Sequence, residues 1–351
     1  MTLRLVPVVA AKTLRRGLSG LDINKRGTPA GEVPVPEATG LAAGAAFLCA
    51  SLVFQWLQHA TGAQESLLPG GGAHAGLVCV LAALFLGFVD DVLDVPWRVK
   101  LAMPTLASLP LLMAYTGHTG VVVPHPLRPL LGGLAFLDLG VIYKLYMLAV
   151  AVFCTNSINI LAGVNGLEAG QTLVLALACA AHSMRVLASL PGAWPAVDAA
   201  AKLQAHALSL SLVGPLAGVS AGILCFNWYP SAVFVGDTFT LFAGMTLAVA
   251  GILGHYSETL LLLFAPQVFN FVYSLPQLAK IVPCPRHRLP RLDPATGLLH
   301  GSNDYNLVNL VLRVGGPRTE KSLATALLCI QAACAVATFA VRHVLAGVYK
   351  G

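Results

Sequence analysis

The chain is 351 residues long, with 57% hydrophobic and 10% charged residues and a mean hydropathy of +0.77. These values exclude a soluble globular protein and are typical of an integral membrane protein. The net charge of +6 is modest and gives no indication of a nucleic-acid partner. The alternating ten-residue segments of an outer-membrane barrel are missing, so an all-α, polytopic bundle of transmembrane helices is expected.

Apolar runs long enough to cross a membrane recur along the chain and predict nine full spans. In chain order these spans cover 38–57, 75–93, 101–115, 138–156, 167–190, 205–226, 234–254, 257–280 and 322–341. The first eleven residues, MTLRLVPVVAA, are apolar but too short to cross, and they lack the layout of a secretory signal. The eight cysteines lie mostly in apolar runs with no CxxC pair, so they are expected to be reduced packing residues.

The Lys and Arg residues of the loops predict which face of the membrane is cytoplasmic. With nine spans, fourteen of them fall on one face, namely Lys12, Arg15, Arg16, Lys25, Arg26, Arg98, Lys100, Lys280, Arg286, Arg288, Arg291, Arg313, Arg318 and Lys321. The other face carries Arg128, Arg185, Lys202, Arg342 and Lys350. The positive-inside rule makes the first face cytoplasmic.

Four polar segments from separate hairpins share this cytoplasmic face. They are LGFVDDVLDVPWRVK at 86–100, FCTNSINILAGVNGLEAG at 153–170, NWYPSAVFVGDTF at 227–239 and CPRHRLPR at 284–291. The opposite loops consist largely of Gly, Pro, Ser and Ala. A working site open to the cytosol is therefore expected within one membrane domain, residues 1–351, because the 281–321 loop that carries PRHR is too short for its own core.

Oxygen ligands and cations gather in these segments. The oxygen ligands are Asp90, Asp91, Asn156, Asn159, Glu168 and Asp237. Hard oxygen donors suit Mg2+, or Mn2+, which proteins usually bind through one or two carboxylates together with substrate phosphates. Lys100, Arg286 and Arg288 are the side chains that a phosphate requires. A divalent metal beside phosphate-binding cations indicates phosphoryl transfer, and carboxylates at the membrane indicate a lipid-borne substrate.

Each feature also has a purely structural interpretation. The pair Asp90 and Asp91 could be a hydrated helix end, and PRHR could be positive-inside charge alone. Asn156 and Asn159 could hydrogen-bond between helices, and GVNG could cap one. Asp237 could cap the seventh span. Their joint placement on one face favours a site.

The chain resembles eukaryotic members of the polyprenyl-phosphate N-acetylhexosamine-1-phosphate transferase family in the segments LGFVDDVLDVPWRVKLAMPTLASLPLLM, FCTNSINILAGVNGLEAG, NWYPSAVFVGDTFTLFAGMT and FAPQVFNFVYSLPQLAKIVPCPRHRLPRL. The resemblance runs from GLDINK, at residue 20, through the last span. It implies a homodimer in the endoplasmic reticulum membrane with its site facing the cytosol. It also implies transfer of GlcNAc-1-phosphate from UDP-GlcNAc to dolichyl phosphate, giving GlcNAc-diphosphodolichol and UMP, the tunicamycin-sensitive first step of N-glycan precursor assembly.

The resemblance further implies roles for single residues. Asn159 and Asp237 match the family's magnesium ligands, and Asp90 and Asp91 match its aspartate pair. That pair either organises the metal site or accepts a proton from the lipid phosphate. Because the phosphate has a second pKa of about 6 and is largely ionised at neutral pH, a positioning role is favoured.

The remaining matches concern substrate binding. Lys100 and Arg286 match phosphate-binding positions; Gly163, Asn165 and Phe234 match the uridine pocket; His287 and Arg288 match the sugar-recognition segment. Trp97 is expected over the phosphates as part of a lid, with an interfacial tryptophan as the alternative. Asn156 and Glu168 are further candidate substrate-binding residues.

The sequence departs from the family pattern in two places, and three rival functions are open to it. Only a short segment precedes GLDINK, where the family has a full span, so a truncated first span is expected before the nine full ones, and the loop after PRHRLPR is short. A nucleotide-sugar carrier would need polar residues along a path through the membrane, and an inactive structural subunit would not need the metal and phosphate set. GLDINK and PRHR favour the eukaryotic transferase over the bacterial type that acts on undecaprenyl phosphate.

Overall fold

The computed structural model describes residues 1–62, 71–115, 117–190, 196–285 and 287–350. Its α-helices are α1 (Thr2–Arg15), α2 (Gly40–Ala60), α4 (Gly71–Leu93), α5 (Trp97–Ala107), α6 (Leu109–Ala114), α7 (Val141–Ile160), α8 (Leu167–Ala188), α9 (Ala196–Asn227), α10 (Gly236–Leu253), α11 (Ser257–Leu263), α12 (Ala265–Leu278), α13 (Leu307–Gly315) and α14 (Glu320–Lys350). Short 3-10 helices cover Ile23–Lys25, Pro29–Glu32 and His125–Leu131. Three antiparallel hairpins pair β1 (Ser19–Leu21) with β2 (Pro34–Pro36), β3 (Gly120–Val122) with β4 (Phe136–Asp138), and β5 (Arg291–Asp293) with β6 (Leu298–His300).

Seven of the described helices, α2, α4, α7, α8, α9, α10 and α14, are long and apolar enough to cross a membrane. The pair α11 and α12 passes the same test jointly, bent by 70°, which raises the number to eight. The prediction of a polytopic helical membrane protein is confirmed. The predicted count of nine full spans is not, because two of the predicted spans are broken helices within the described residues.

Prolines explain both breaks. The predicted span 101–115 is divided at Ser108 into α5 and α6, and Pro110 has no N–H to bond the carbonyl of Leu106 one turn earlier. The predicted span 257–280 breaks at Phe264, and Pro266 follows in the first turn of α12. Apolar length alone does not reveal these breaks, because proline is compatible with an apolar run.

The amino-terminal segment that was predicted to be too short to cross forms α1. This 14-residue helix packs against α2 and α9 and buries Val6 and Ala10. At the close contact with α9, Gly222 leaves room for Thr2. Leu3, Val8 and Leu14 of the same helix stay exposed, so packing covers only one side of α1.

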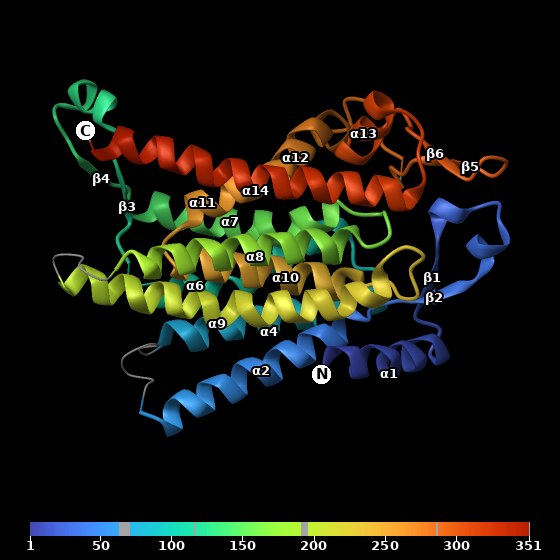
Figure 1. Cartoon of the computed structure of the whole chain (residues 1–351), viewed down its shortest axis with the longest axis horizontal. Helices are drawn as coiled ribbons and strands as arrows, with labels where there is room; N and C mark the ends of the chain where they lie inside the picture. Colours follow the sequence, from blue (N-terminus) through green and yellow to red (C-terminus); the bar gives the residue numbers. More distant parts are fainter. Residues whose placement is uncertain (63–70, 116, 191–195, 286, 351) are drawn as a thin grey trace.

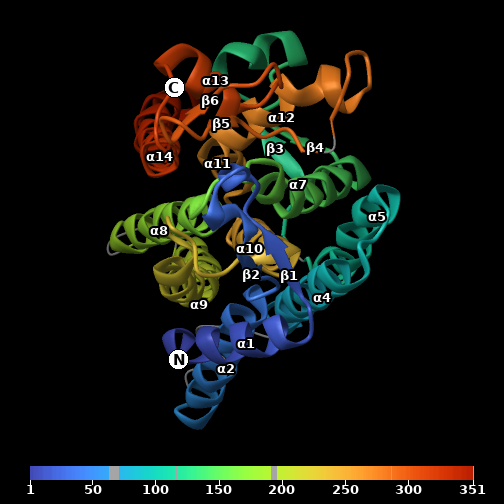
Figure 2. The same ribbon diagram turned by 90° about the vertical axis from the view of Figure 1, so that its right-hand side faces the viewer.

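Helix α10 forms the axis of the bundle, with α4, α7 and α9 packed around it (Figure 2). Every residue from Thr238 to Leu253 is buried. Gly87 of α4 lies against the backbone of Asp237, and Gly244 of α10 lies against the carbonyl of Cys154 in α7. These small residues let the helix backbones approach closely, as the composition indicates.

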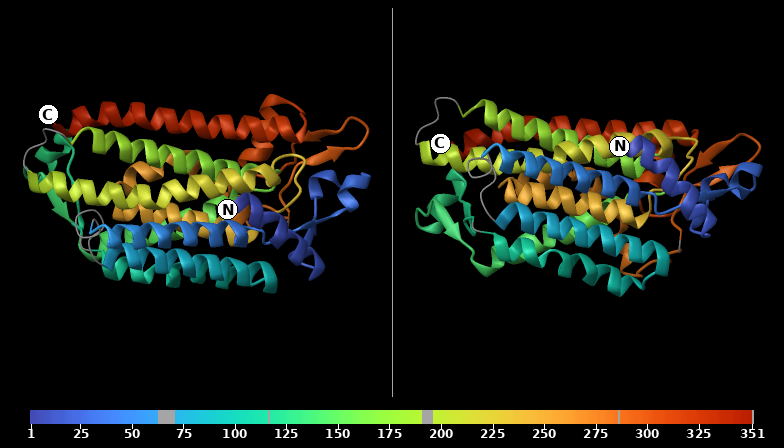
Figure 3. Two further views of the ribbon diagram at one scale, coloured as in Figure 1. Left: turned by 60° about the horizontal axis from the view of Figure 1, so that its bottom comes forward. Right: turned by 90° about the horizontal axis from the view of Figure 1, so that it is seen from below.

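The three hairpins are divided between the two ends of the bundle. The β1–β2 and β5–β6 hairpins lie together at one end, and the β3–β4 hairpin lies at the other (Figures 1 and 3). The first end also holds the carboxyl ends of α4 and α7 and the amino end of α10 (Figure 1). The four predicted polar segments therefore meet at a single end of the molecule.

Candidate active site

Asp237 lies at the centre of a cluster of polar side chains from three helices. It is the second residue of α10. Asn159, near the end of α7, donates its amide to Asp237 Oδ1, and Lys100 of α5 lies 3.3 Å from Asp237 Oδ2. Asn159 and Lys100 are 78 and 137 positions away in the sequence, so the fold brings together three residues that were predicted to share a site.

Asp91 holds the amino terminus of α10 from the neighbouring helix α4. Its Oδ1 accepts the N–H of Asp237 at 2.7 Å, and its Oδ2 accepts the N–H of Thr238 at 3.0 Å and the Thr238 hydroxyl at 2.5 Å. The first N–H groups of a helix have no partner within the helix, so this carboxylate satisfies two of them. Asp237 itself does not cap the helix, because its side chain faces Asn159 and Lys100.

Asp90 is engaged differently from its neighbour. It is 3% exposed, its Oδ2 lies 2.8 Å from Lys100 Nζ, and its Oδ1 accepts the N–H of Val95 at 3.1 Å. Burial lowers the pKa of Lys100, but the hydrogen bond to Asp90 and the charges of Asp237 and Asp90 outweigh it, so the pKa is raised overall. Lys100 therefore stays protonated and bridges two carboxylates, while Asp91 fixes the backbone beside them.

The pair Asn159 and Asp237 fits a divalent cation that is bound jointly with phosphates. Within the described part of the chain, no group of three or more His, Cys, Asp and Glu side chains is arranged to hold a metal. Asn159 donates through its amide nitrogen, which leaves its oxygen available, and the contacts of Asp237 described above come from side chains. One carboxylate and one amide oxygen leave coordination positions for water and phosphate oxygens, as Mg2+ prefers.

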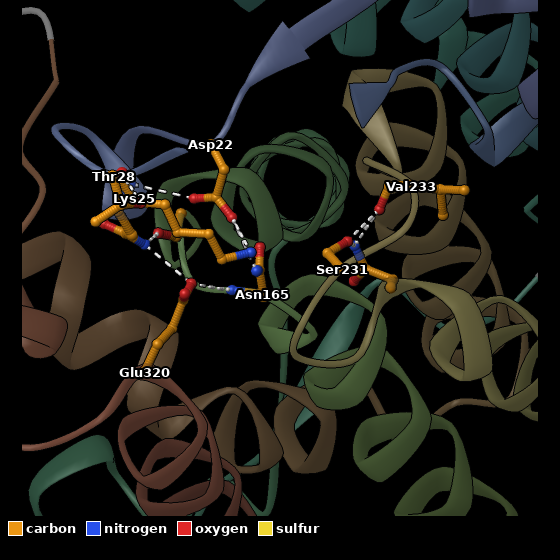
Figure 4. Close-up of polar contacts among 10 residues, drawn as sticks. Asp22, Lys25, Thr28, Asn165, Ser231, Val233 and Glu320 are labelled. Carbon is orange, nitrogen blue, oxygen red and sulfur yellow. Dashed lines mark hydrogen bonds and ion pairs between the residues drawn. The ribbon is translucent and has the colours of Figure 1, made fainter. Parts of the chain in front are cut away.

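The GVNG turn between α7 and α8 is held by residues of the amino-terminal hairpin and of α14 (Figure 4). Asn24 donates to the Gly163 carbonyl at 2.7 Å and to Glu320 Oε1 at 3.1 Å. The same Glu320 oxygen accepts the N–H of Asn165 at 3.0 Å. The amide of Asn165 in turn donates to Asp22 Oδ2 at 3.0 Å. Two carboxylates therefore fix both the backbone and the side chain of Asn165.

The hairpin also reaches the NWYP segment. Lys25 Nζ lies 2.8 Å from Asp22 Oδ2 and 5.2 Å from the centroid of the Tyr229 ring. A Cβ at Gly20 of β1 would lie 3.4 Å from the Phe234 ring. The residues of β1 and the turn after it thus contact both side chains predicted for the uridine pocket, Phe234 through Gly20 and Asn165 through Asp22.

The PRHR loop closes against the same turn. The carbonyl of Arg288 accepts hydrogen bonds from Asn306 at 2.7 Å and Asn309 at 3.1 Å, which anchors the loop to α13. Gly163 has a φ of +88°, and a Cβ there would overlap Leu289. Among the described residues, nothing forms a hydrogen bond with the buried Nη1 of Arg288. A buried, unpaired guanidinium nitrogen is costly, so this atom indicates a ligand with acceptor oxygens.

The other predicted residues stand as follows. Arg286 lies outside the described residues, and Trp97 begins α5 with its side chain outside them. His287 is exposed. Asn156 donates to the carbonyl of Val152 on its own helix at 2.8 Å, and the structure does not join it to Asp237. Glu168 accepts the N–H of Gly163 at 2.9 Å and so supports the GVNG turn.

Several residues of this region were missed in the sequence. They are Asp22, Asn24, Lys25, Glu37, Thr238 and Glu320. Glu37 is half-buried, and burial together with the charge of Asp91 raises its pKa. The signal available for the first three was the Asp-x-Asn-Lys run of GLDINK between two apolar segments, and Glu320 reads as an ordinary acidic residue at the start of a helix.

A carboxylate and amide pair, a bridging lysine and an arginine whose buried Nη1 has no partner among the described residues lie at one end of this bundle, an arrangement that suits a membrane-embedded transferase of phosphate-bearing substrates. Residues 74–255 match glycosyl transferase family 4. The chain belongs to this family, which confirms the resemblance found in the sequence.

Relatives with established names cover most of the chain. The UDP-N-acetylglucosamine–dolichyl-phosphate N-acetylglucosaminephosphotransferase of Dictyostelium discoideum is 42% identical over 98% of this chain and 86% of the relative. The protein of the same name from Schizosaccharomyces pombe is 43% identical over 86% of this chain and 70% of the relative. That of Saccharomyces cerevisiae is 33% identical over 99% and 89%.

Proposed function

We propose that this chain transfers GlcNAc-1-phosphate from UDP-GlcNAc to dolichyl phosphate, giving GlcNAc-diphosphodolichol and UMP. The names of the relatives over nearly the full chain support this reaction. In the transfer, an oxygen of the lipid phosphate bonds to the β-phosphorus of UDP-GlcNAc and the bond to UMP breaks. The observation that carries the proposal is the joining of Asp237, Asn159 and Lys100 at one end of the bundle.

Asn159 and Asp237 would hold Mg2+, with Mn2+ as a substitute. The cation supplies charge neutralisation for the phosphates that the reaction brings together. Lys100 adds a second positive charge beside Asp237, and its raised pKa keeps that charge in place. Arg286 and Arg288 bind phosphate and sugar from the PRHR loop, and the buried Nη1 of Arg288 supports a direct contact.

Asp90 and Asp91 position the site and do not act as a general base. Both oxygens of Asp91 accept hydrogen bonds from the start of α10, and those of Asp90 are taken by Lys100 and Val95. These contacts hold the start of α10 and the side chain of Lys100 in place, which is the task of positioning residues. The lipid phosphate, with a second pKa of about 6, is already largely ionised at neutral pH.

The nucleotide and sugar lie between the GVNG turn and the PRHR loop. Asn165 reads the edge of the uracil, Phe234 stacks on it, and Gly163 keeps the turn close to Leu289. His287 and Arg288 contact the GlcNAc, and Trp97, Asn156 and Glu168 line or support the phosphate region.

The protein works in the endoplasmic reticulum membrane as a homodimer, with its site facing the cytosol. The excess of Lys and Arg in the loops that share the site's face supports this orientation. The acceptor is dolichyl phosphate and not undecaprenyl phosphate, because the relatives that match most of the chain are named for dolichyl phosphate. A bacterial phospho-N-acetylmuramoyl-pentapeptide-transferase matches only 56% of the chain, at 31% identity.

The test is release of labelled UMP and transfer of labelled GlcNAc to lipid in detergent, with dolichyl or undecaprenyl phosphate and with or without Mg2+ and tunicamycin. We expect lipid-dependent, metal-dependent, tunicamycin-sensitive product, and dolichyl phosphate as the better acceptor. Asp237→Asn should abolish turnover, whereas Asp138→Asn, an exposed aspartate of β4 at the opposite end, should not. Product formation by Asp237→Asn at the wild-type rate contradicts the metal assignment, and no product from folded wild type contradicts the function.

A further inference from the structure

The side-chain amide of Asn165 has one fixed orientation. A carboxylate accepts hydrogen bonds and does not donate, so the NH2 group of Asn165 must face Asp22 Oδ2, 3.0 Å away (Figure 4). Lys25 Nζ lies 2.8 Å from the same oxygen and forms an ion pair with it. Asp22 and Asn165 are 4% and 6% exposed. The amide oxygen of Asn165 is therefore fixed on the other side of the group.

We infer that Asp22 sets the base specificity of the enzyme by fixing the orientation of the Asn165 amide so that the pocket accepts uracil and rejects cytosine. This inference rests on the proposed uridine pocket and adds to it a positioning residue that does not touch the substrate. Asp22 also accepts the N–H of Asn24 through Oδ1 at 3.1 Å, but its effect on the base passes through Oδ2 and the Asn165 amide.

The hydrogen-bonding edges of the two bases explain the selection. Uracil presents an acceptor, O4, beside a donor, N3–H, whereas cytosine presents a donor, the 4-amino group, beside an acceptor, N3. A fixed amide has its remaining N–H and its oxygen in set places, which match one order of donor and acceptor. Rotation of the terminal amide by half a turn exchanges the two and would suit the other base. Asp22 prevents that rotation, because the rotated amide would turn its oxygen toward the carboxylate.

The neighbouring contacts provide a matched control. Glu320 accepts the backbone N–H of Asn165 and leaves the amide alone. Phe234 stacks equally well on either pyrimidine, because each has a π face. Substitution of Glu320 or loss of the stacking ring would therefore weaken the binding of UMP and CMP to the same extent. Substitution of Asp22 would change the ratio of the two affinities.

The variants are Asp22→Asn and Glu320→Gln in the full-length protein in detergent. An asparagine at residue 22 offers both a donor and an acceptor, so the Asn165 amide finds a partner in either orientation. The measurements are Kd for UMP and CMP, and kcat and KM for UDP-GlcNAc and CDP-GlcNAc. For the wild type we expect UMP to bind about 10- to 100-fold more tightly than CMP, as two mismatched hydrogen bonds require.

In Asp22→Asn we expect that preference to fall by about tenfold or more, through a higher KM for UDP-GlcNAc and a lower one for CDP-GlcNAc, with kcat for UDP-GlcNAc nearly unchanged. In Glu320→Gln the preference should stay at its wild-type value. An Asp22→Asn enzyme that binds UMP and keeps the wild-type ratio overturns the inference. So does a wild-type protein that binds N3-methyl-UMP as tightly as UMP, a result that does not require any variant to fold.

Failure of the proposed function looks different. A wild-type protein that forms no lipid product from UDP-GlcNAc contradicts the reaction, whatever its ratio of UMP to CMP binding. A wild-type protein that makes product from UDP-GlcNAc, together with an unchanged ratio in Asp22→Asn, contradicts only the role of Asp22.

Discussion

The carboxylate of Asp91 occupies the space that a side chain at residue 236 would need. Gly236 has a φ of +73°, and a Cβ there would overlap both carboxylate oxygens. Because Asp91 also accepts the N–H groups of Asp237 and Thr238, any displacement of this carboxylate releases the start of α10. The position of the Asp237 carboxylate thus depends on glycine, which has no side chain, at residue 236.

Gly236→Ala should reduce turnover by about 100-fold or more, because displacement of a catalytic group by about 1 Å has this effect. Its melting temperature should also fall. Gly132→Ala is the control, since Gly132 has a φ of +66° with open space around its Cβ position. The backbone strain in that variant should lower the free energy of unfolding by about 1 kcal/mol without loss of activity. Equal activity in the two variants would mean that the overlap with Asp91 is unimportant.

Lys100→Ala should lower kcat by about 100- to 1000-fold, the usual effect of removing one preorganised charge from a site of this kind. Asp90 and Asp237 would then face each other without the lysine between them. Lys100→Arg should retain part of the activity, and Lys144→Ala, an exposed lysine at the start of α7, should retain all of it. Steady-state kinetics at saturating Mg2+ provide the measurement, and an unchanged kcat in Lys100→Ala would exclude Lys100 from the reaction.

Glu37→Gln should make the protein more stable at neutral and alkaline pH. The native pKa of Glu37 is raised above its ordinary value of 4.5, so the folded state binds the proton more tightly and stability falls as the pH rises above that value. The variant lacks this penalty. Thermal unfolding in EDTA at about pH 4 and about pH 8 should show equal melting temperatures at the lower pH and a higher one for the variant at the upper. Glu32→Gln, at an exposed glutamate, should show no such divergence; a lower melting temperature for Glu37→Gln at the upper pH would contradict the assignment.

Arg288→Leu should raise the melting temperature of the ligand-free protein and weaken the binding of UDP-GlcNAc. The change removes a buried guanidinium nitrogen that has no partner in the part of the chain that the structure describes, and leucine keeps much of the aliphatic stem. The KM for UDP-GlcNAc should rise by about tenfold or more, since the ligand loses a charged donor. Arg313→Leu is a suitable comparison because Arg313 already donates to Tyr273, so its loss should not stabilise. A destabilised Arg288→Leu protein with normal KM would assign this arginine to packing.

Much of the fold was predictable because the membrane imposes a length and a composition on each span. Seven predicted spans correspond to single helices, and α4 and α10 end or begin within a few residues of the predicted limits. The two broken helices were not predicted, since Pro110 and Pro266 lie inside runs that remain apolar. Proline changes the backbone without changing hydropathy, so a count of apolar residues does not detect it.

Part of the candidate site was also predictable from the sequence, and part was not. Chemical type predicted the gathering of Asp237, Asn159 and Lys100, because hard oxygens and a cation on one face have few other uses in a membrane protein. The different tasks of Asp90 and Asp91 were not predictable, because adjacent residues on a helix point about 100° apart and their partners lie far away in the sequence. Glu320 was missed because its partner also lies far away in the sequence: its contact with Asn165 joins positions 155 residues apart.

The burial of α10 changes what natural variation this helix tolerates. The most apolar stretch of α10 is 83% buried with a hydropathy of 1.5, whereas that of α4 is 44% buried with 2.2. In a helix surrounded by protein, the substitutions that are tolerated depend on side-chain volume and not on solubility in lipid. Exchange of Thr246 for Ser changes volume little, whereas a Cβ at Gly251 would lie 2.7 Å from Leu260, and Leu or Ile at Gly244 would collide with the backbone of α7. Variant libraries of α10 should therefore be depleted of large aliphatic residues at Gly244 and Gly251, although a transmembrane segment facing lipid accepts such residues most readily.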